Sequence, residues 1–486
     1  MMIDKSNRFR ALGTAKPGEL ESLRQQMLAQ DTDYLPAYHI APKTGHLNDP
    51  NGMVFDGEKY HLFYQWFPFG PFHGMKHWKY LITKDFIHFE EGDVLVPETE
   101  FETHGIYSGG AICIDGFIYC FYSGNVMNED GETFSQNQNV AKYSTDGKLL
   151  DRWNIVPKAP VGYTGNFRDP SPFINDEGEL MFVVGAQRED EAGATLLYKM
   201  TSLTQAELVG EVSYGGVSDL SRQAAVYMHE CPDISHSNGK DLFILSPMGL
   251  KPQAERYNNI FSTQLMIGQY QRGEMHAEQV IELDKGFDFY APQTFTDSER
   301  NIMLAWCGNG SLSIPTELLG WKFMLSMPRE LLMEGNKLMQ RPLVEFDQLK
   351  QPLVTLEQPG RYDIDGNLSQ SHIIVDGIDD QTFSLTLFED AEYKLMLAYQ
   401  DGSLLLDRSQ TVETDDMKRF GSERRVRLSS LQQLEIFIDN SVIEIFINGG
   451  EEVMTSRFFI PNRCHNMTFY GAAEVKVSEM AAISLY

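Results

Sequence analysis

Three acidic residues stand at recurring places in the chain, each just before a proline. Asp49 and Asp169 directly precede Pro50 and Pro170, and one cysteine separates Glu230 from Pro232. Two carboxylates that flank a glycosidic bond can hydrolyse it. Carboxylates held close together raise the pKa of at least one of them, as a general acid near neutral pH requires. Any one of these acids alone is better explained as a turn residue before a strand, and only the recurrence favours catalysis.

The acids recur because the segment around them recurs. After Asp49 come two apolar runs, residues 53–55 and 60–66, separated by Asp56 and Gly57. An Asp-Gly pair between apolar runs is a strong hairpin signal. The same pattern of anchor, strand, turn and strand occurs five times, and successive anchors are 60 or 62 residues apart, at Pro50, Gly110, Pro170, Pro232 and Pro292.

A period of this size holds about four strands with their turns, which indicates a repeat architecture. Four-stranded units around a channel are the blades of a β-propeller. We therefore predict five blades, with the three acids together at one end of the channel. An open solenoid is the alternative, and we disfavour it because each unit contains full hairpins.

The two ends of the chain differ from the repeat. Residues 1–35 carry the one helical pattern, with Pro17 near its start and a short stripe of Leu20, Leu23, Met27 and Leu28. Beyond residue 340, alternating strands continue without a helix, which favours a β-sandwich. The predicted fold is all-β in three parts: an N-terminal helical extension (1–35) packed on the main body, a five-bladed β-propeller catalytic domain (36–340) and a β-sandwich domain (341–486).

Composition excludes several functional classes. The net charge of −29 argues against nucleic acid or an anionic membrane as a partner. No apolar run reaches the length of a membrane span, and the N-terminus lacks the apolar core of a secretion signal. The five cysteines form no C-x-x-C pair, so we predict no metal and no cofactor, and the lack of an export signal favours reduced thiols. The expected compartment is the cytoplasm, and the oligomeric state stays open, with a homodimer as one option.

Side chains suited to a sugar occur in the same repeating region of the sequence as the acids. Sugars are bound by flat aromatic faces and by amides, and the residues of these types are Asn48, Gln65, Trp66, Trp78, Tyr290 and Trp306. Each aromatic residue taken alone is more often part of a core. No nucleotide-binding loop, zinc-ligand spacing or Gly-x-Ser-x-Gly motif competes with a sugar site.

At these residues the chain resembles glycoside hydrolase family 32, the β-fructosidases. Three boxes match the family signatures in order and spacing, at residues 48–52, 167–170 and 230–233, and residues 288–293 and 327–330 match further family stretches. The resemblance covers residues 35–486 and implies a five-bladed propeller with a C-terminal sandwich.

The resemblance also implies roles for individual residues. Asp49 would be the nucleophile, Glu230 the acid/base and Asp169 the residue that stabilises the transition state. Retention through a fructosyl-enzyme predicts carboxyl groups about 5 Å apart. The expected substrate contacts are His46, Leu47, Asn48, Gln65, His73, Trp78, Ser108, Gly109, Arg168, Cys231, Tyr290 and Trp306. His46 and His73 replace tryptophans of the usual family pattern, and Gly110 replaces a serine.

Within the family, a helical extension without a signal is similar to the cytoplasmic sucrose-6-phosphate hydrolases of bacteria. We therefore expect hydrolysis of sucrose 6-phosphate, and of sucrose. By position, the candidates for holding a phosphate are Lys76, Lys79, Lys251 and Arg256. Three alternatives stay open: a fructan exo-hydrolase of the same family, an inverting arabinan or xylan hydrolase similar to family 43, and a non-catalytic fructoside-binding protein.

Overall fold

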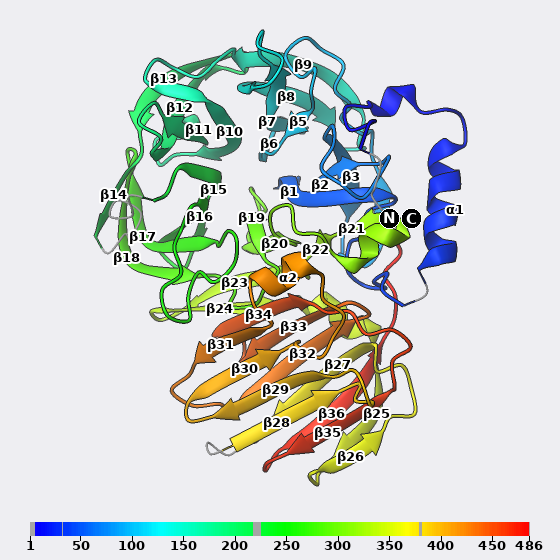
Figure 1. The fold of residues 1–486 in the computed structure, drawn as a ribbon. Helices are drawn as coiled ribbons and strands as arrows, with labels where there is room; N and C mark the ends of the chain where they lie inside the picture. The colour runs from blue at the N-terminus through cyan, green and yellow to red at the C-terminus, as the bar shows by residue number, and fades with distance from the viewer. Residues whose placement is uncertain (1–4, 32, 217–224, 379–381, 486) are drawn as a thin grey trace.

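The computed structural model describes residues 5–31, 33–216, 225–378 and 382–485. The chain starts with a short 3-10 turn, η1 (Leu12–Thr14), and helix α1 (Glu19–Gln30), which lies along the side of the molecule (Figure 1). Gly18, directly after Pro17, is the N-cap of α1. Met27 packs with Trp321, whereas Leu28 is exposed. The prediction of a small helix packed on the main body is confirmed.

The part of the chain after α1 folds into five sheets, as the five repeats predict. Each sheet has four or five strands. The strands of the first two sheets are β1 (Gly45–Phe55), β2 (Tyr60–Phe67), β3 (His77–Thr83) and β4 (Phe89–Glu91), then β5 (Ile106–Tyr107), β6 (Ala111–Ile114), β7 (Phe117–Met127), β8 (Phe134–Ser144) and β9 (Leu149–Val156). The third and fourth sheets contain β10 (Tyr163–Ile174), β11 (Leu180–Arg188), β12 (Gly193–Ser202) and β13 (Gln205–Glu211), then β14 (Ser213–Gly216), β15 (Met228–Ser237), β16 (Lys240–Met248), β17 (Gln264–Gln271) and β18 (Glu274–Glu282). The fifth contains β19 (Tyr290–Thr294), β20 (Ile302–Cys307), β22 (Met324–Leu325), β23 (Arg329–Glu334) and β24 (Lys337–Pro342).

The five sheets close into a ring. Between the first and second sheets, the Gly52 N–H donates to the Gly109 carbonyl at 2.9 Å. Between the last and first sheets, the Phe55 N–H donates to the Thr296 carbonyl at 3.0 Å. A further strand, β21 (Trp321–Lys322), which follows the turn η3 (Pro315–Leu319), pairs in parallel with β1. The sheets surround a common centre (Figure 1), so the fold is a propeller and not an open solenoid.

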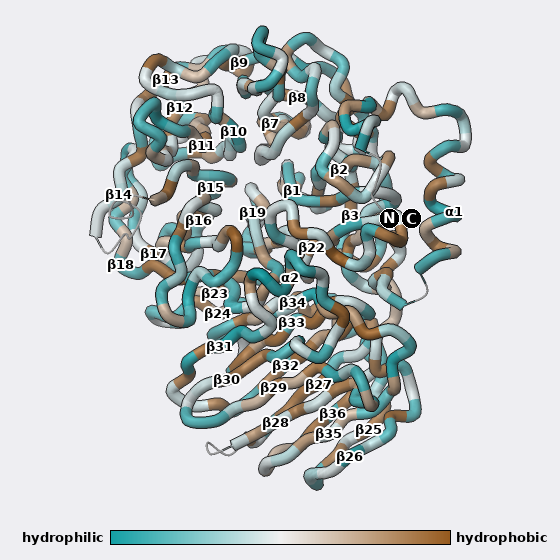
Figure 2. Tube along the Cα trace, viewed as in Figure 1, coloured by the Kyte–Doolittle hydropathy of each residue, from teal (hydrophilic) through white to brown (hydrophobic). Residues whose placement is uncertain are grey.

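The C-terminal part is a sandwich of two six-stranded sheets, preceded by the turn η4 (Val344–Leu349). One sheet contains β25 (Lys350–Leu356), β36 (Glu474–Met480), β27 (Gln370–Asp376), β32 (Gln433–Asp439), β33 (Val442–Ile447) and β34 (Glu452–Arg457). The other contains β26 (Gly360–Asp363), β35 (Asn466–Tyr470), β28 (Thr382–Leu387), β29 (Leu395–Gln400), β30 (Ser403–Asp407) and β31 (Glu423–Arg427). Hydrophobic residues recur along these strands (Figure 2), because each strand turns one side to the shared core.

The expectation of no helix in this part is wrong. A short helix, α2 (Asp415–Arg419), lies between β30 and β31. The Thr414 side chain accepts a hydrogen bond from the Met417 N–H and so caps its first turn. Acidic residues in the first turn and basic residues in the last turn suit the helix dipole. One turn of helix carries too little periodicity to be found by pattern.

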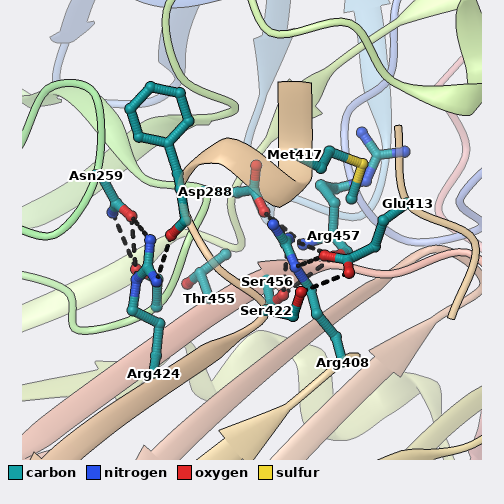
Figure 3. Close-up of polar contacts among 12 residues, drawn as sticks. Asn259, Asp288, Arg408, Glu413, Met417, Ser422, Arg424, Thr455, Ser456 and Arg457 are labelled. Atoms are coloured by element: carbon teal, nitrogen blue, oxygen red, sulfur yellow. Dashed lines mark hydrogen bonds and ion pairs between the residues drawn. The ribbon is translucent and has the colours of Figure 1, made fainter. Parts of the chain in front are cut away.

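Buried charged groups join the propeller to the sandwich (Figure 3). Arg408, next to β30, donates to Asp288 at 3.2 Å and forms an ion pair with Glu413. Arg424 of β31 donates to the Asn259 side chain at 2.7 Å. The last propeller strand ends at Pro342 and the first sandwich strand begins at Lys350. The domain limits expected at residues 35 and 340 stay predictions.

Candidate active site

The three acids lie within the innermost strands, not in turns before them. Asp49 belongs to β1, Asp169 to β10 and Glu230 to β15. Each strand carries one extra residue relative to its partner at this place, which is a β-bulge. Asp169 itself has φ +69°, and Cys231, next to Glu230, has φ +46°, a left-handed backbone that non-glycine residues rarely adopt. The bulges turn the carboxylates toward one end of the channel.

The acids therefore share one cavity of about 530 Å³. Eleven of the residues expected at the site line it: His46, Asn48, Asp49, Gln65, His73, Ser108, Arg168, Asp169, Glu230, Tyr290 and Trp306. They come from all five sheets or from the segments that join their strands. The convergence predicted from the repeat is present in the fold.

A chain of hydrogen bonds ends on Asp49. Ser108 Oγ donates to Asp49 Oδ2 at 2.5 Å, and Gln65 Nε2 donates to Ser108 Oγ at 2.6 Å. Asn48 Nδ2 donates to Gln65 Oε1 at 2.5 Å, and the buried Lys76 ammonium donates to Asn48 Oδ1. Each amide or hydroxyl has its orientation set by its neighbours, so the chain holds the Asp49 carboxylate in one position.

The same chain connects two linked charges. Burial raises the pKa of Asp49, the hydrogen bond from Ser108 opposes this, and the charge on Glu230 adds to it. Burial lowers the pKa of Lys76 to about 7, although the Asp49 carboxylate favours its charged form. Lys76 therefore loses its proton near neutral pH, and it stabilises the negative charge of Asp49 only while it is protonated.

Glu230 is held from two sides. Arg168 donates to Glu230 Oε1 from Nε at 3.0 Å and from its terminal nitrogen at 2.7 Å. The Tyr290 hydroxyl lies 2.7 Å from Glu230 Oε2 and 2.9 Å from the Ser246 carbonyl. These contacts fix the carboxyl group over the cavity, because both of its oxygens have a partner.

Asp169 has the environment that close carboxylates were predicted to create. Burial raises its pKa to about 7; the neighbouring Arg168 opposes this shift, and the charges on Glu230 and Asp49 add to it. Asp169 Oδ2 accepts a hydrogen bond from the Cys231 N–H at 3.0 Å. A carboxyl group in this state can accept or donate a hydrogen bond near neutral pH.

Four residues expected as substrate contacts do not line the cavity. Leu47 and Trp78 are fully buried in the core, and the indole N–H of Trp78 donates to the Tyr107 carbonyl at 3.1 Å. Gly109 donates its N–H to Asn51 Oδ1, and Cys231 is buried behind Asp169. These residues support the site from behind, because their side chains or backbone groups face the protein.

The sequence did not reveal the other residues that line the cavity, namely Tyr107, Thr133, Phe134, Gln136, Asn166, Met248, Phe261, Gly310 and Ser311. Two of them carry a signal in hindsight, since Tyr107 adjoins Ser108 and Asn166 lies two residues before Arg168. The rest lie further from the matched boxes, and only the closure of the ring brings them to the cavity.

None of the four residues suggested for phosphate binding lines the cavity. Lys76 is buried, and Lys79 forms an ion pair with Glu91 at 2.5 Å. Arg256 donates to the Tyr257 hydroxyl, and Lys251 is exposed. Position in the sequence was a poor guide here, because it does not show which way a side chain points, and only Lys79 of the four lies in a strand.

Among the described residues, no group of three or more His, Cys, Asp or Glu side chains is arranged to hold a metal ion. Of the helices in the described ranges, none has both the length and the apolar character needed to cross a membrane.

Known proteins match this chain over nearly its whole length. A sucrose-6-phosphate hydrolase of Vibrio alginolyticus is 34% identical over 484 residues, which span 98% of this chain and 96% of that protein. One of Bacillus subtilis (strain 168) is 32% identical, over 90% of this chain and 91% of that protein. The structure of sucrose-6-phosphate hydrolase from Lactobacillus gasseri superposes with a TM-score of 0.91 at 26% identity, over 99% and 100% of the two chains.

A second solved structure is a mutant GH32 beta-fructofuranosidase of Bombyx mori in complex with sucrose. It has a TM-score of 0.80 at 26% identity and covers 96% of this chain and 98% of its own. Residues 39–342 match the model for the glycosyl hydrolases family 32 N-terminal domain, and residues 338–484 match that for the family 32 C terminal. The chain therefore belongs to glycosyl hydrolase family 32.

Proposed function

We propose that this glycoside hydrolase is a retaining β-fructofuranosidase that hydrolyses sucrose 6-phosphate to glucose 6-phosphate and fructose, and also accepts sucrose. The observation that carries this is the convergence of Asp49, Asp169 and Glu230 in one cavity of a family 32 chain. The relatives named sucrose-6-phosphate hydrolase match it over nearly its whole length, which supports the choice of substrate.

In the first step, a carboxylate oxygen of Asp49 attacks the anomeric carbon of the fructosyl unit. The bond from that carbon to the bridging oxygen breaks, and Glu230 gives its proton to this oxygen, so that glucose 6-phosphate leaves. Ser108 holds Asp49 Oδ2, and Arg168 with Tyr290 holds the Glu230 carboxyl. Both groups are thus oriented before substrate arrives, which lowers the entropy cost of the reaction.

In the second step, Glu230 takes a proton from water while the water oxygen attacks the same anomeric carbon. The ester bond to Asp49 breaks, fructose leaves with its original configuration, and both carboxyl groups return to their starting states. Asp169 would hydrogen-bond fructose hydroxyl groups and stabilise the positive charge that develops on the ring.

The cavity also offers groups that bind neutral sugar. Trp306 lines it, and its indole N–H has no hydrogen-bond partner among the described residues. A sugar hydroxyl group would satisfy this donor, and the ring offers an apolar face to the sugar. All five cysteines are free thiols, which supports a reducing compartment such as the cytoplasm for this enzyme.

Replacement of Asp49 tests the nucleophile. Purified Asp49→Asn is expected to lose at least about a thousandfold in kcat on sucrose 6-phosphate, because the amide cannot form the fructosyl ester. The measurement is the release of glucose 6-phosphate in a coupled assay. Asp146→Asn, at an exposed turn between β8 and β9, is the matched control and should keep full activity.

Proton NMR of the first-formed fructose separates retention from inversion. The β-anomer should appear first and then mutarotate. If the α-anomer appeared first, or if Asp49→Asn hydrolysed the substrate as fast as the wild type, the proposed mechanism would be wrong.

A further inference from the structure

The segment before α1 lies against the loop that carries His73. The Met75 N–H donates to the Arg8 carbonyl at 2.5 Å, and the Leu12 N–H is 2.8 Å from His77 Nε2. Both partners are within four residues of His73, which lines the cavity. The N-terminal segment is therefore tied to one side of the cavity entrance.

Phe9, next to Arg8, connects the N-terminal segment to a second side of the cavity entrance. The Phe9 ring lies edge-on to His104, with 5.2 Å between ring centroids, and 6.1 Å from the Phe134 ring. Phe134 lines the cavity. The Arg8 guanidinium lies over the Phe9 ring at 4.5 Å, a cation–π contact that orients it. Arg8 is thus placed between the His73 loop and Phe134.

Positive charges gather on this side of the cavity. The charge on Lys76 and burial lower the pKa of His73 to about 3, and Lys322 and Arg8 add to this effect. Lys76 is engaged with Asn48, and Lys322 pairs with Glu317 at 2.5 Å. Arg8 differs from both, since it is exposed and forms no ion pair with an acid of the described chain.

An unpaired arginine beside other cations is unfavourable in the empty protein, and the chain as a whole carries a net charge of −29. Such a local reversal of sign favours an anionic ligand over a neutral one. A planar guanidinium also matches a phosphate geometrically, because it can donate two parallel hydrogen bonds.

We propose that Arg8 binds the phosphate group of sucrose 6-phosphate, and that the N-terminal segment thereby sets the preference for phosphorylated substrate. This inference rests on the proposed function, and it assigns the preference of the enzyme for phosphorylated substrate to one residue. Arg8 has no contact with the three acids, so it acts on binding of the phosphorylated sugar and not on bond cleavage.

Arg8→Gln tests this role. We expect kcat/KM for sucrose 6-phosphate to fall about 10- to 100-fold, mostly through KM, because a charge-assisted contact is lost. The kcat/KM for sucrose should stay unchanged. Arg8→Lys, which keeps the charge but loses the paired donors, should give an intermediate loss. Arg272→Gln is the charge-matched control, since Arg272 is exposed at the turn between β17 and β18 and lines a different cavity of the molecule.

A binding measurement makes the result independent of turnover. By calorimetry, the wild type should bind glucose 6-phosphate more tightly than glucose, and Arg8→Gln should lose that difference. If the wild type shows no preference for phosphorylated sugar, the proposed substrate is wrong. If the wild type prefers it and Arg8→Gln keeps the preference, or loses activity on both sugars equally, the role of Arg8 is wrong and the proposed function stands.

Discussion

Among the residues of the site, Asp169 is held in surroundings that lower the stability of the folded protein. It lies beside two other carboxylates, and its pKa is raised from 3.8 to about 7. Between these two values the native state holds a proton that the unfolded chain releases. The free energy of unfolding therefore decreases as the pH rises from about 4 to about 7. The site keeps this arrangement at a cost in stability, as active sites commonly do.

Asp169→Asn should remove that cost. Above pH 7 we expect the variant to be more stable than the wild type by a few kcal/mol, on the order that a shift of this size implies. Below about pH 4 the two proteins should be equally stable, because Asp169 is protonated in both states. Urea unfolding between pH 4 and 8 measures the difference. Parallel curves for the two proteins over this range would contradict the raised pKa.

At the scale of the elements, the site depends on bulges and on one close backbone approach. The inner strand of the second sheet is interrupted between β5 and β6, where Ser108 reaches Asp49. Gly109 makes this approach feasible, since a Cβ at this position would lie 1.9 Å from the Phe121 carbonyl oxygen. A larger residue would have to separate the segment from β7 and withdraw the Ser108 hydroxyl.

Gly109→Ala is therefore expected to lower stability by about 3 kcal/mol or more, because the clash is with backbone that cannot rotate away. Activity should fall with it, since Asp49 loses its hydrogen bond. Gly13→Ala is the control, as a Cβ there meets nothing within 4 Å. Urea unfolding and kcat on sucrose 6-phosphate are the measurements. An unchanged unfolding midpoint in Gly109→Ala would show that the segment can move.

At the scale of the whole molecule, buried ion pairs connect the propeller to the sandwich. His39 lies fully buried, with Nδ1 2.8 Å from Asp439 and Nε2 3.3 Å from Glu444. Burial disfavours its charge, but the two carboxylates outweigh burial and raise its pKa from 6.5 to about 9. Arg329 of β23 also donates to Glu444, at 2.7 Å. The contact between the two parts is therefore sensitive to pH.

Because its pKa is raised, His39 stabilises the folded protein more at low pH than at high pH. The stabilisation by His39 is fully present below pH 6.5 and is lost as the pH rises through 9. His39→Gln should lower stability at pH 6 by about 3 kcal/mol, because it removes a positively charged partner from two buried carboxylates, Asp439 and Glu444. The substitution should also reduce the decrease in the free energy of unfolding between pH 6.5 and 9. His88→Gln, an exposed histidine paired with Asp85, serves as the control. If the free energy of unfolding of His39→Gln fell with pH as steeply as that of the wild type, another group would be responsible for the decrease.

Much of this organisation could be predicted from local patterns. The hairpin at Asp56 and Gly57 is present between β1 and β2, with Gly57 at φ +97°. Such hairpins recur about every 60 residues, and each repeat forms one sheet of four or five strands. The three acids at equivalent positions of the repeat mark where the sheets meet. These features are local, because strand alternation and turn chemistry depend on neighbouring residues.

Only the tertiary structure decided which side chains face the cavity. Trp78 and Trp306 looked alike as candidate sugar contacts, yet Trp78 is fully buried and Trp306 lines the cavity. Trp78 lies on β3, which pairs with β2 and not with the inner strand β1, whereas Trp306 on β20 lies directly opposite Tyr290 of the inner strand β19. Arg8 and His73 are 65 positions apart, and packing of the N-terminal segment brings them to one entrance. The sequence by itself thus determined the repeat and its three acids, whereas register and long-range packing decided what surrounds them.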